Sequence, residues 1–174
     1  MRLVSRKPSE TKAAGRKLGK LLSPGSTVYL YGELGSGKTV FVKGMAGAFG
    51  IPEKEIASAS FVLIAEHEGR LRGRKIPFYH IDLYRLESAR EAEAIGIEDY
   101  IDSDGVAVVE WADRLSRPEE GAREAREALE ALRVRINIVS GEEREIIIEG
   151  NIKGNEECDE KDRHSNKRGH TGGR

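Results

Sequence analysis

Cysteine is almost absent from the sequence, and the single residue, Cys158, excludes a disulfide within the chain. Such sparing use of cysteine is typical of proteins that fold in a reducing compartment. Long hydrophobic runs are also missing, because no apolar stretch approaches the length that spans a bilayer and the N-terminal residues lack the form of a signal peptide. These absences predict a cytoplasmic protein that does not associate with a membrane.

An excess of charge of either sign is absent as well, since 29 Lys and Arg residues and 30 Asp and Glu residues give a net charge of −1. The chain as a whole therefore lacks the basic character of a protein that binds nucleic acid directly, which leaves open only a local basic patch. Hydrophobic residues make up 38% and charged residues 34% of the 174 positions. This composition predicts one domain with one apolar core beneath a heavily charged surface.

The C-terminal segment differs from the rest of the chain in composition. Residues 151–174 contain one aliphatic side chain, Ile152, among many Gly, Asn, Lys, Asp and Glu residues. Such a segment buries too little apolar surface to fold by itself. We therefore predict a folded domain over residues 1–150 and a disordered polar tail over residues 151–174.

Upstream of this tail, the apolar residues follow the periods of both helices and strands. Helical spacing and capping residues predict helices over residues 9–22, 38–49, 88–95 and 119–131. Short runs rich in β-branched and aromatic residues, or alternating in polarity, predict strands over residues 27–31, 61–66, 76–81, 106–109, 132–139 and 144–149. Turn residues between neighbouring strands indicate two hairpins, and we expect Ser9 or Thr11 to cap the first helix.

The most informative motif is the segment Gly32-Glu33-Leu34-Gly35-Ser36-Gly37-Lys38-Thr39. It matches the pattern G-x-x-x-x-G-K-[ST] of the phosphate-binding loop, and a predicted strand precedes it while a predicted helix follows it. Its glycines allow positive φ angles that bring backbone N–H groups around phosphate oxygens, and the following helix directs the positive end of its dipole at the anion. We expect Lys38 to reach the β- and γ-phosphates and the Thr39 hydroxyl to ligate Mg²⁺.

This loop and the order of elements predict an α/β fold. We expect a single P-loop NTPase-like domain with a mixed, mainly parallel central sheet flanked by helices. The sequence has no Asn-Lys-x-Asp stretch of the kind that reads guanine. The predicted nucleotide is therefore ATP.

Two acidic residues end predicted strands and are candidates for the acid that P-loop chemistry requires near Mg²⁺. Asp82 follows residues 76–81, and Glu110 follows residues 106–109. Both are expected near the phosphate loop, because ligands of open α/β sheets bind at the carboxyl ends of the strands. The alternative for each is a solvent-exposed acid without a function. His80 is interpreted as a packed strand residue and not as a base.

Further segments extend the pattern behind the phosphate loop. They are Tyr31 itself, then Phe41-Val42-Lys43-Gly44, Ser58-Ala59-Ser60-Phe61, His80-Ile81-Asp82-Leu83-Tyr84-Arg85-Leu86, Gly96-Ile97-Glu98-Asp99-Tyr100 and Val109-Glu110-Trp111. In this order they resemble the TsaE (YjeE) family, small P-loop ATPases of bacterial tRNA threonylcarbamoyladenosine synthesis. The resemblance covers residues 9–139, and the ordered set is far more specific than the phosphate loop alone.

The resemblance implies a mixed-sheet P-loop fold and slow intrinsic ATPase activity, with ATP and Mg²⁺ as cofactors. It also implies two partner proteins, TsaD and TsaB, which transfer threonylcarbamoyl to adenosine 37 of tRNA. The resemblance further implies that the protein resets this pair between turnovers, so that tRNA is reached through the complex and not by strong direct binding.

The same resemblance implies roles for individual residues. Thr39 and Glu110 are the implied metal ligands, and the implied catalytic residues are Asp82, Glu110, Trp111 and Ser60. The positions implied to contact the nucleotide are Thr11, Gly35, Ser36, Gly37, Lys38, Thr39 and Val40.

Two departures from the family pattern bear on turnover more than on binding. Ala59 and Ser60 stand where the family usually has Pro and Thr in a switch-like loop, so the loop is less restricted in conformation. Val40 replaces the second Thr of the usual Gly-Lys-Thr-Thr and removes a hydroxyl near the phosphates. Two other functions stay open at this point, namely a small-molecule or nucleoside kinase and a non-catalytic nucleotide-dependent switch.

Overall fold

The computed structural model describes residues 1–57, 63–101, 103–115 and 132–151. Its strands are β1 (Arg2–Ser5), β2 (Ser26–Tyr31), β3 (Ile64–Leu71), β4 (Arg74–Asp82), β5 (Val106–Glu110), β6 (Leu132–Ser140) and β7 (Glu143–Glu149). Its helices are α1 (Pro8–Gly19), α2 (Lys38–Ala48), α3 (Ala89–Ala94) and α4 (Ile97–Ile101), with short 3-10 helices η1 (Glu53–Glu55) and η2 (Ala112–Leu115).

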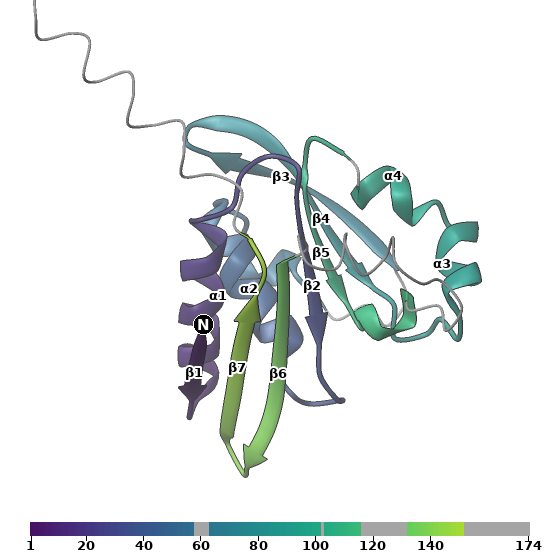
Figure 1. Cartoon of the computed structure of the whole chain (residues 1–174). Coiled ribbons are helices and arrows are strands. Elements are labelled where there is room, and N and C mark those ends of the chain that lie inside the picture. Colours follow the sequence, from purple (N-terminus) through teal and green to yellow (C-terminus); the bar gives the residue numbers. More distant parts are fainter. Residues whose placement is uncertain (58–62, 102, 116–131, 152–174) are drawn as a thin grey trace, which may run out of the picture.

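All seven of these strands form one sheet in the order β1-β7-β6-β2-β5-β4-β3 (Figure 1). The four central strands, β6, β2, β5 and β4, run parallel to one another. The outer strands β7, β1 and β3 pair in antiparallel fashion. The expected mixed, mainly parallel sheet is confirmed, and the carboxyl ends of β2, β4 and β5 meet at one edge of it.

Helices cover both faces of this sheet, as Figure 1 shows with α1 and α2 beside each other and α3 and α4 on the opposite side. Val108 of β5 faces the core beneath α1 and α2, whereas its neighbour Val109 faces the core beneath α3 and α4. This alternation follows from the two-residue period of a strand. Because both faces are covered, β5 is buried along its whole length, as expected from its continuous apolar sequence.

The two helices nearest the phosphate loop, α1 and α2, pack with their backbones in close contact. A Cβ atom added at Gly15 of α1 would lie 2.1 Å from the carbonyl oxygen of Phe41, and one added at Gly44 of α2 would lie 2.0 Å from that of Lys12. Side chains at these two positions would therefore push the helices apart. The glycines allow α1 to lie directly against the helix that begins at Lys38.

Some predicted boundaries and caps are wrong. The first helix covers Pro8–Gly19 and not residues 9–22, and its N-cap residue is Lys7, which makes no side-chain cap hydrogen bond. The predicted cap Thr11 lies inside the helix, where its hydroxyl is 2.7 Å from the Ser5 hydroxyl. The helix begins earlier than expected because proline is favoured in the first turn, where its missing N–H and fixed φ cost nothing, so Pro8 starts the helix without a polar cap before it.

Other elements were missed or are longer than predicted. Strand β1 was not predicted, because four residues show little periodicity and their pairing partner β7 lies at the other end of the domain. Helix α4 is five residues long and was also missed. The first hairpin extends over Ile64–Leu71 and Arg74–Asp82, so Gly69, which lies between the two strands predicted over residues 61–66 and 76–81, pairs with Ile76 inside the ladder.

Three predicted features fall outside the part of the chain that the structure describes. They are the switch-like segment with Ser60, the charged helix over residues 119–131 and most of the polar tail. The division into residues 1–150 and 151–174 therefore stays a prediction. Among the described helices, none combines the length and the apolar character that crossing a membrane would require.

Candidate functional site

The predicted phosphate loop lies between the carboxyl end of β2 and the first residue of α2. Three of its glycines have positive φ angles, 147° at Gly32, 78° at Gly35 and 102° at Gly37. Only glycine adopts these conformations without strain. A Cβ atom at Gly32 would also lie 2.5 Å from the carbonyl oxygen of Ile136. Backbone and packing thus both require the glycines that the motif contains.

Lys38 is buried at this loop and is held by polar and aromatic contacts. Its Nζ donates hydrogen bonds to the carbonyl oxygens of Gly32 and Glu33, at 2.7 and 3.1 Å. The same atom lies 3.8 Å from the centroid of the Trp111 ring, which is a cation–π contact. Burial lowers the pKa of Lys38, against the opposing effect of nearby carboxylates, of which Glu110 is the strongest.

Thr39, Glu110 and His80 form a connected row of side chains. The Thr39 hydroxyl donates to one carboxylate oxygen of Glu110, Oε2, at 3.0 Å. The other oxygen, Oε1, lies 2.9 Å from Nε2 of His80. Glu110 and His80 are each only 2% exposed. The structure therefore brings the two predicted metal ligands together and adds a histidine behind them.

Asp82 lies beside Glu110, because these two residues pair in the register of the parallel strands β4 and β5. Asp82 is buried, and its Oδ1 accepts a hydrogen bond from the backbone N–H of Tyr84 at 3.0 Å. Both acids are thus buried at the carboxyl ends of their strands, and neither is a solvent-exposed strand end. The charge of Asp82 also raises the pKa of Lys38, against the effect of burial. Asp82 therefore lies close enough to interact electrostatically with the phosphate loop.

Trp111 follows β5 in an unusual backbone conformation, with φ at 59°. Positive φ is uncommon for a bulky residue and persists only where surrounding contacts hold it. The half-buried ring lies 5.0 Å from the ring of Tyr84, centroid to centroid, and also contacts Lys38. The Trp111 ring therefore forms part of the site beside Lys38, where it is neither fully buried in the core nor fully exposed.

The remaining predicted nucleotide contacts lie around the same loop. Thr11 is buried, and a Cβ atom at Gly37 would lie 3.8 Å from its methyl group. Ser36 is fully buried, and its hydroxyl has no hydrogen-bond partner among the residues that the structure describes. Val40 is half-buried in the first turn of α2. A buried hydroxyl without a protein partner is consistent with a phosphate ligand.

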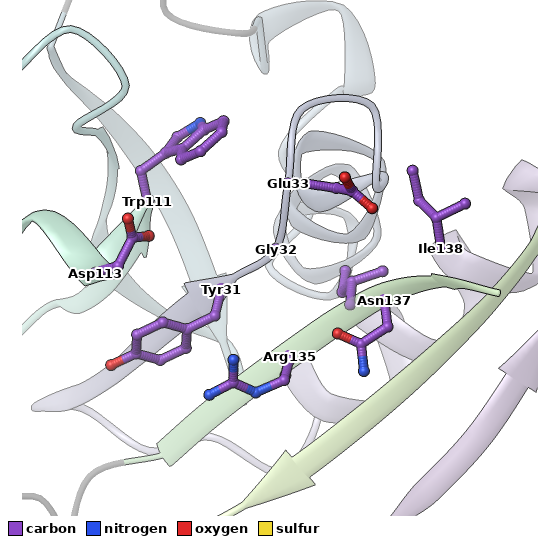
Figure 2. Close-up of a pocket in the computed structure, with 9 residues that line it drawn as sticks. Tyr31, Gly32, Glu33, Trp111, Asp113, Arg135, Asn137 and Ile138 are labelled. Carbon is purple, nitrogen blue, oxygen red and sulfur yellow. The ribbon is translucent and has the colours of Figure 1, made fainter.

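A pocket of about 540 Å³ adjoins the loop on the side of Trp111. Figure 2 shows Trp111 and Asp113 on one side of it, and Asn137 and Ile138 of β6 on the other. Tyr31 also lines the pocket, and its pKa is raised by burial against the opposing effect of Arg133 and Arg135. The pocket thus carries aromatic rings and charges of both signs.

The oxygen atoms of Thr39 and Glu110 suit a hard cation such as Mg²⁺. The described residues contain no group of three or more His, Cys, Asp or Glu side chains that could hold a metal ion by themselves. Proteins usually bind Mg²⁺ through one or two side chains together with substrate phosphates and water. The residues present are therefore compatible with Mg²⁺ that accompanies a nucleotide.

His80 is the contact of this site that sequence reasoning missed. It was interpreted as a packing residue, and it is indeed buried in its strand. The two-residue period of β4 could have indicated a polar contact, because it places His80 and Asp82 on the same face as the buried Phe78. A polar side chain on such a face needs a hydrogen-bond partner.

Strand β2, the glycine-rich loop and α2, with acids at the ends of neighbouring parallel strands, define a protein of the P-loop class. Residues 5–146 match the family described as "Threonylcarbamoyl adenosine biosynthesis protein TsaE". The chain belongs to this TsaE family.

Individual relatives agree with this assignment. A protein of Treponema pallidum named "tRNA threonylcarbamoyladenosine biosynthesis protein TsaE" is 44% identical over 116 residues, which are 67% of this chain and 82% of the relative. A protein of the same name from Bacillus subtilis is 35% identical over 162 residues, which are 91% and 92% of the two chains.

A solved structure is similar as well. The crystal structure of Bacillus subtilis YdiB superposes with a TM-score of 0.60 at 32% identity, and the match covers 84% of this chain and 82% of that one. The fold, the family and a place in the tRNA threonylcarbamoyladenosine pathway are therefore shared, and the P-loop fold suggests nucleotide binding.

Proposed function

We propose that this protein binds ATP with Mg²⁺ and hydrolyses it to ADP and phosphate in support of tRNA threonylcarbamoylation. The observation that carries the proposal is the 3.0 Å hydrogen bond between Thr39 and Glu110, directly behind the buried Lys38. It joins the hydroxyl of the phosphate loop to an acid at the end of a parallel strand. P-loop enzymes use this pair to hold Mg²⁺.

The other side chains of the site would divide the remaining tasks. Lys38 would exchange its contacts with the carbonyl oxygens of Gly32 and Glu33 for contacts with the β- and γ-phosphates. Asp82 would orient the attacking water or accept its proton. Bound Mg²⁺ supplies neutralisation of the phosphate charge in this chemistry. Thr11 would contribute near the nucleotide base, on the α1 side of the loop.

The biological role that we propose is the one that the resemblance to the TsaE family implies. The protein would act on the TsaD–TsaB complex, which modifies adenosine 37 of tRNA, and would reset it between turnovers. The net charge of −1 supports contact with tRNA through that complex and not by strong direct binding. A cytoplasmic location accords with this role.

Turnover by the purified protein, alone and with TsaD and TsaB of the same organism, tests the proposal. Release of ADP and free phosphate is the expected result. Transfer of a labelled γ-phosphate to an acceptor would instead identify a kinase. Binding of ATP without either reaction would identify a switch, and the departures at Ala59, Ser60 and Val40 make this the result to exclude first.

Lys38→Ala tests nucleotide binding directly. The variant loses the charge that the phosphates would contact, so calorimetry should show that ATP affinity is severely weakened or lost. Thr39→Ala should reduce mainly the part of the affinity that depends on Mg²⁺. Unchanged ATP affinity in a folded Lys38→Ala protein would contradict the assignment of the phosphate loop.

A further inference from the structure

His80 is buried near the carboxyl end of β4, and the acid that it contacts lies on the neighbouring strand β5. In the strand register His80 pairs with Val108 and Asp82 pairs with Glu110. The Glu110 side chain must therefore lean back along β5, away from its direct neighbour Asp82, to bring Oε1 within 2.9 Å of Nε2 of His80.

We propose that His80 is a positioning residue, which holds the Glu110 carboxylate in the orientation that Thr39 and Mg²⁺ use. The inference rests on the proposed function, because it concerns the same metal-dependent nucleotide site. It assigns to His80 no contact with the nucleotide or the metal.

The hydrogen bonds at Glu110 support this assignment. A carboxylate only accepts hydrogen bonds, so the Thr39 hydroxyl and the His80 ring must both be donors to an ionised Glu110. Each donor holds a different carboxylate oxygen, Oε2 by Thr39 and Oε1 by His80. Two donors on opposite oxygens restrict rotation of the carboxylate about its last side-chain bond. Oxygen Oε2 is thereby directed at the phosphate loop.

Burial makes the histidine hard to replace by solvent. Glu110 and His80 are each 2% exposed, so water has little access to Oε1 if the histidine donor is lost. The carboxylate would then turn toward another donor and leave the geometry that it shares with Thr39. Its direct neighbour Asp82 carries a like charge, which opposes rotation toward that side. Outer partners that orient metal ligands in this way typically change metal affinity by roughly 10- to 100-fold when they are removed.

The experiment compares His80→Leu, which has no donor, with His80→Gln, whose side-chain amide can donate from nearly the position of Nε2. Phe78→Leu is the matched control, because Phe78 is buried on the same face of the same strand and is not part of the hydrogen-bonded row. Calorimetry measures the affinity for a non-hydrolysable ATP analogue in EDTA and across a series of Mg²⁺ concentrations. Thermal unfolding without nucleotide or metal measures stability separately.

For His80→Leu we expect a rise of roughly 10- to 100-fold in the Mg²⁺ concentration required for half of the metal-dependent gain in affinity. Affinity in EDTA should stay within about twofold of the parent, because the contacts of Lys38 and the loop are unchanged. His80→Gln should recover most of the loss, and Phe78→Leu should lower the melting temperature without moving the Mg²⁺ midpoint.

An unchanged Mg²⁺ midpoint in folded His80→Leu would overturn the inference and leave the proposed function intact. Equal losses in EDTA and in Mg²⁺, or a shift of the same size in Phe78→Leu, would overturn it in favour of a general structural role. If His80→Leu does not fold, His80→Met takes its place, because its flexible side chain also lacks a donor: a midpoint raised 10-fold or more supports the inference, and a parent-like midpoint overturns it. A parent protein that binds no nucleotide would refute the proposed function itself, and the inference with it.

Discussion

The close packing of α1 against α2 makes a stability prediction that two neighbouring glycines can test. In α2, Gly44→Ala would place a Cβ atom 2.0 Å from the carbonyl oxygen of Lys12 and 2.8 Å from its carbonyl carbon. Gly47→Ala, three residues further along the same helix, would place it 2.6 Å from Nη2 of Arg16. The first clash is with backbone, whereas the second is with the end of a flexible side chain.

The two substitutions should therefore have opposite signs. Both replace glycine within a helix, which favours folding by about 1 kcal/mol. In Gly44→Ala the helices must also separate by more than about 1 Å to reach the usual C···O contact distance of roughly 3.3–3.6 Å. Overpacking of this kind costs about 1–3 kcal/mol or more, and because no rotamer change relieves a backbone clash we expect a net loss of about 2 kcal/mol.

In Gly47→Ala the Arg16 side chain can move aside, so a gain of up to about 1 kcal/mol is expected. For a chain of this size, each kcal/mol shifts the melting temperature by about 2–4 °C. Gly44→Ala should thus melt about 4–8 °C below the parent, and Gly47→Ala should melt at or slightly above it.

Thermal and urea unfolding followed by circular dichroism provide the assay, with the urea slope as a check that both variants unfold in the same manner. A Gly44→Ala protein as stable as Gly47→Ala would refute the reasoning, because it would mean that α1 and α2 do not lie in backbone contact at this position.

Three further predictions follow from the site and the sequence. Asp82→Asn keeps the size of the side chain and removes its charge, so turnover with the partner proteins should fall by about 10²-fold or more while ATP affinity is retained; parent-like turnover would make Asp82 a structural residue. Truncation after Gly150 should leave ATP binding unchanged and the melting temperature within a few degrees, because the removed segment has one aliphatic side chain; a larger drop would show that the segment docks. Burial lowers the pKa of His67, so the unfolded chain binds the proton more readily and stability should fall as the pH drops through the ordinary range of imidazole. The melting temperature of His67→Gln should therefore fall less than that of the parent between about pH 7 and pH 5. An equal fall in both proteins would contradict this.

The central elements of the fold were predictable because their signals are local. Strand β2, the glycine loop and α2 follow each other without a gap, and each is specified by residues within a few positions. The continuous apolar run of β5 likewise predicted a buried strand, and the acids that end β4 and β5 were correctly expected at one edge of the sheet. Strand β1 was not predictable in this way, because its pairing partner β7 is separated from it by nearly the whole domain.

The sequence by itself determined the phosphate loop, the family and the residue types of the site, since glycine, lysine, threonine and acid at these positions are requirements of local backbone and chemistry. Only the tertiary structure decided which of these side chains touch. The bond from His80 to Glu110 depends on the parallel register of β4 and β5, and the contact of Trp111 with Lys38 depends on a positive φ after β5. Both arise between segments distant in the chain, where a shift of one residue in register would turn a strand's side chains to the opposite face of the sheet.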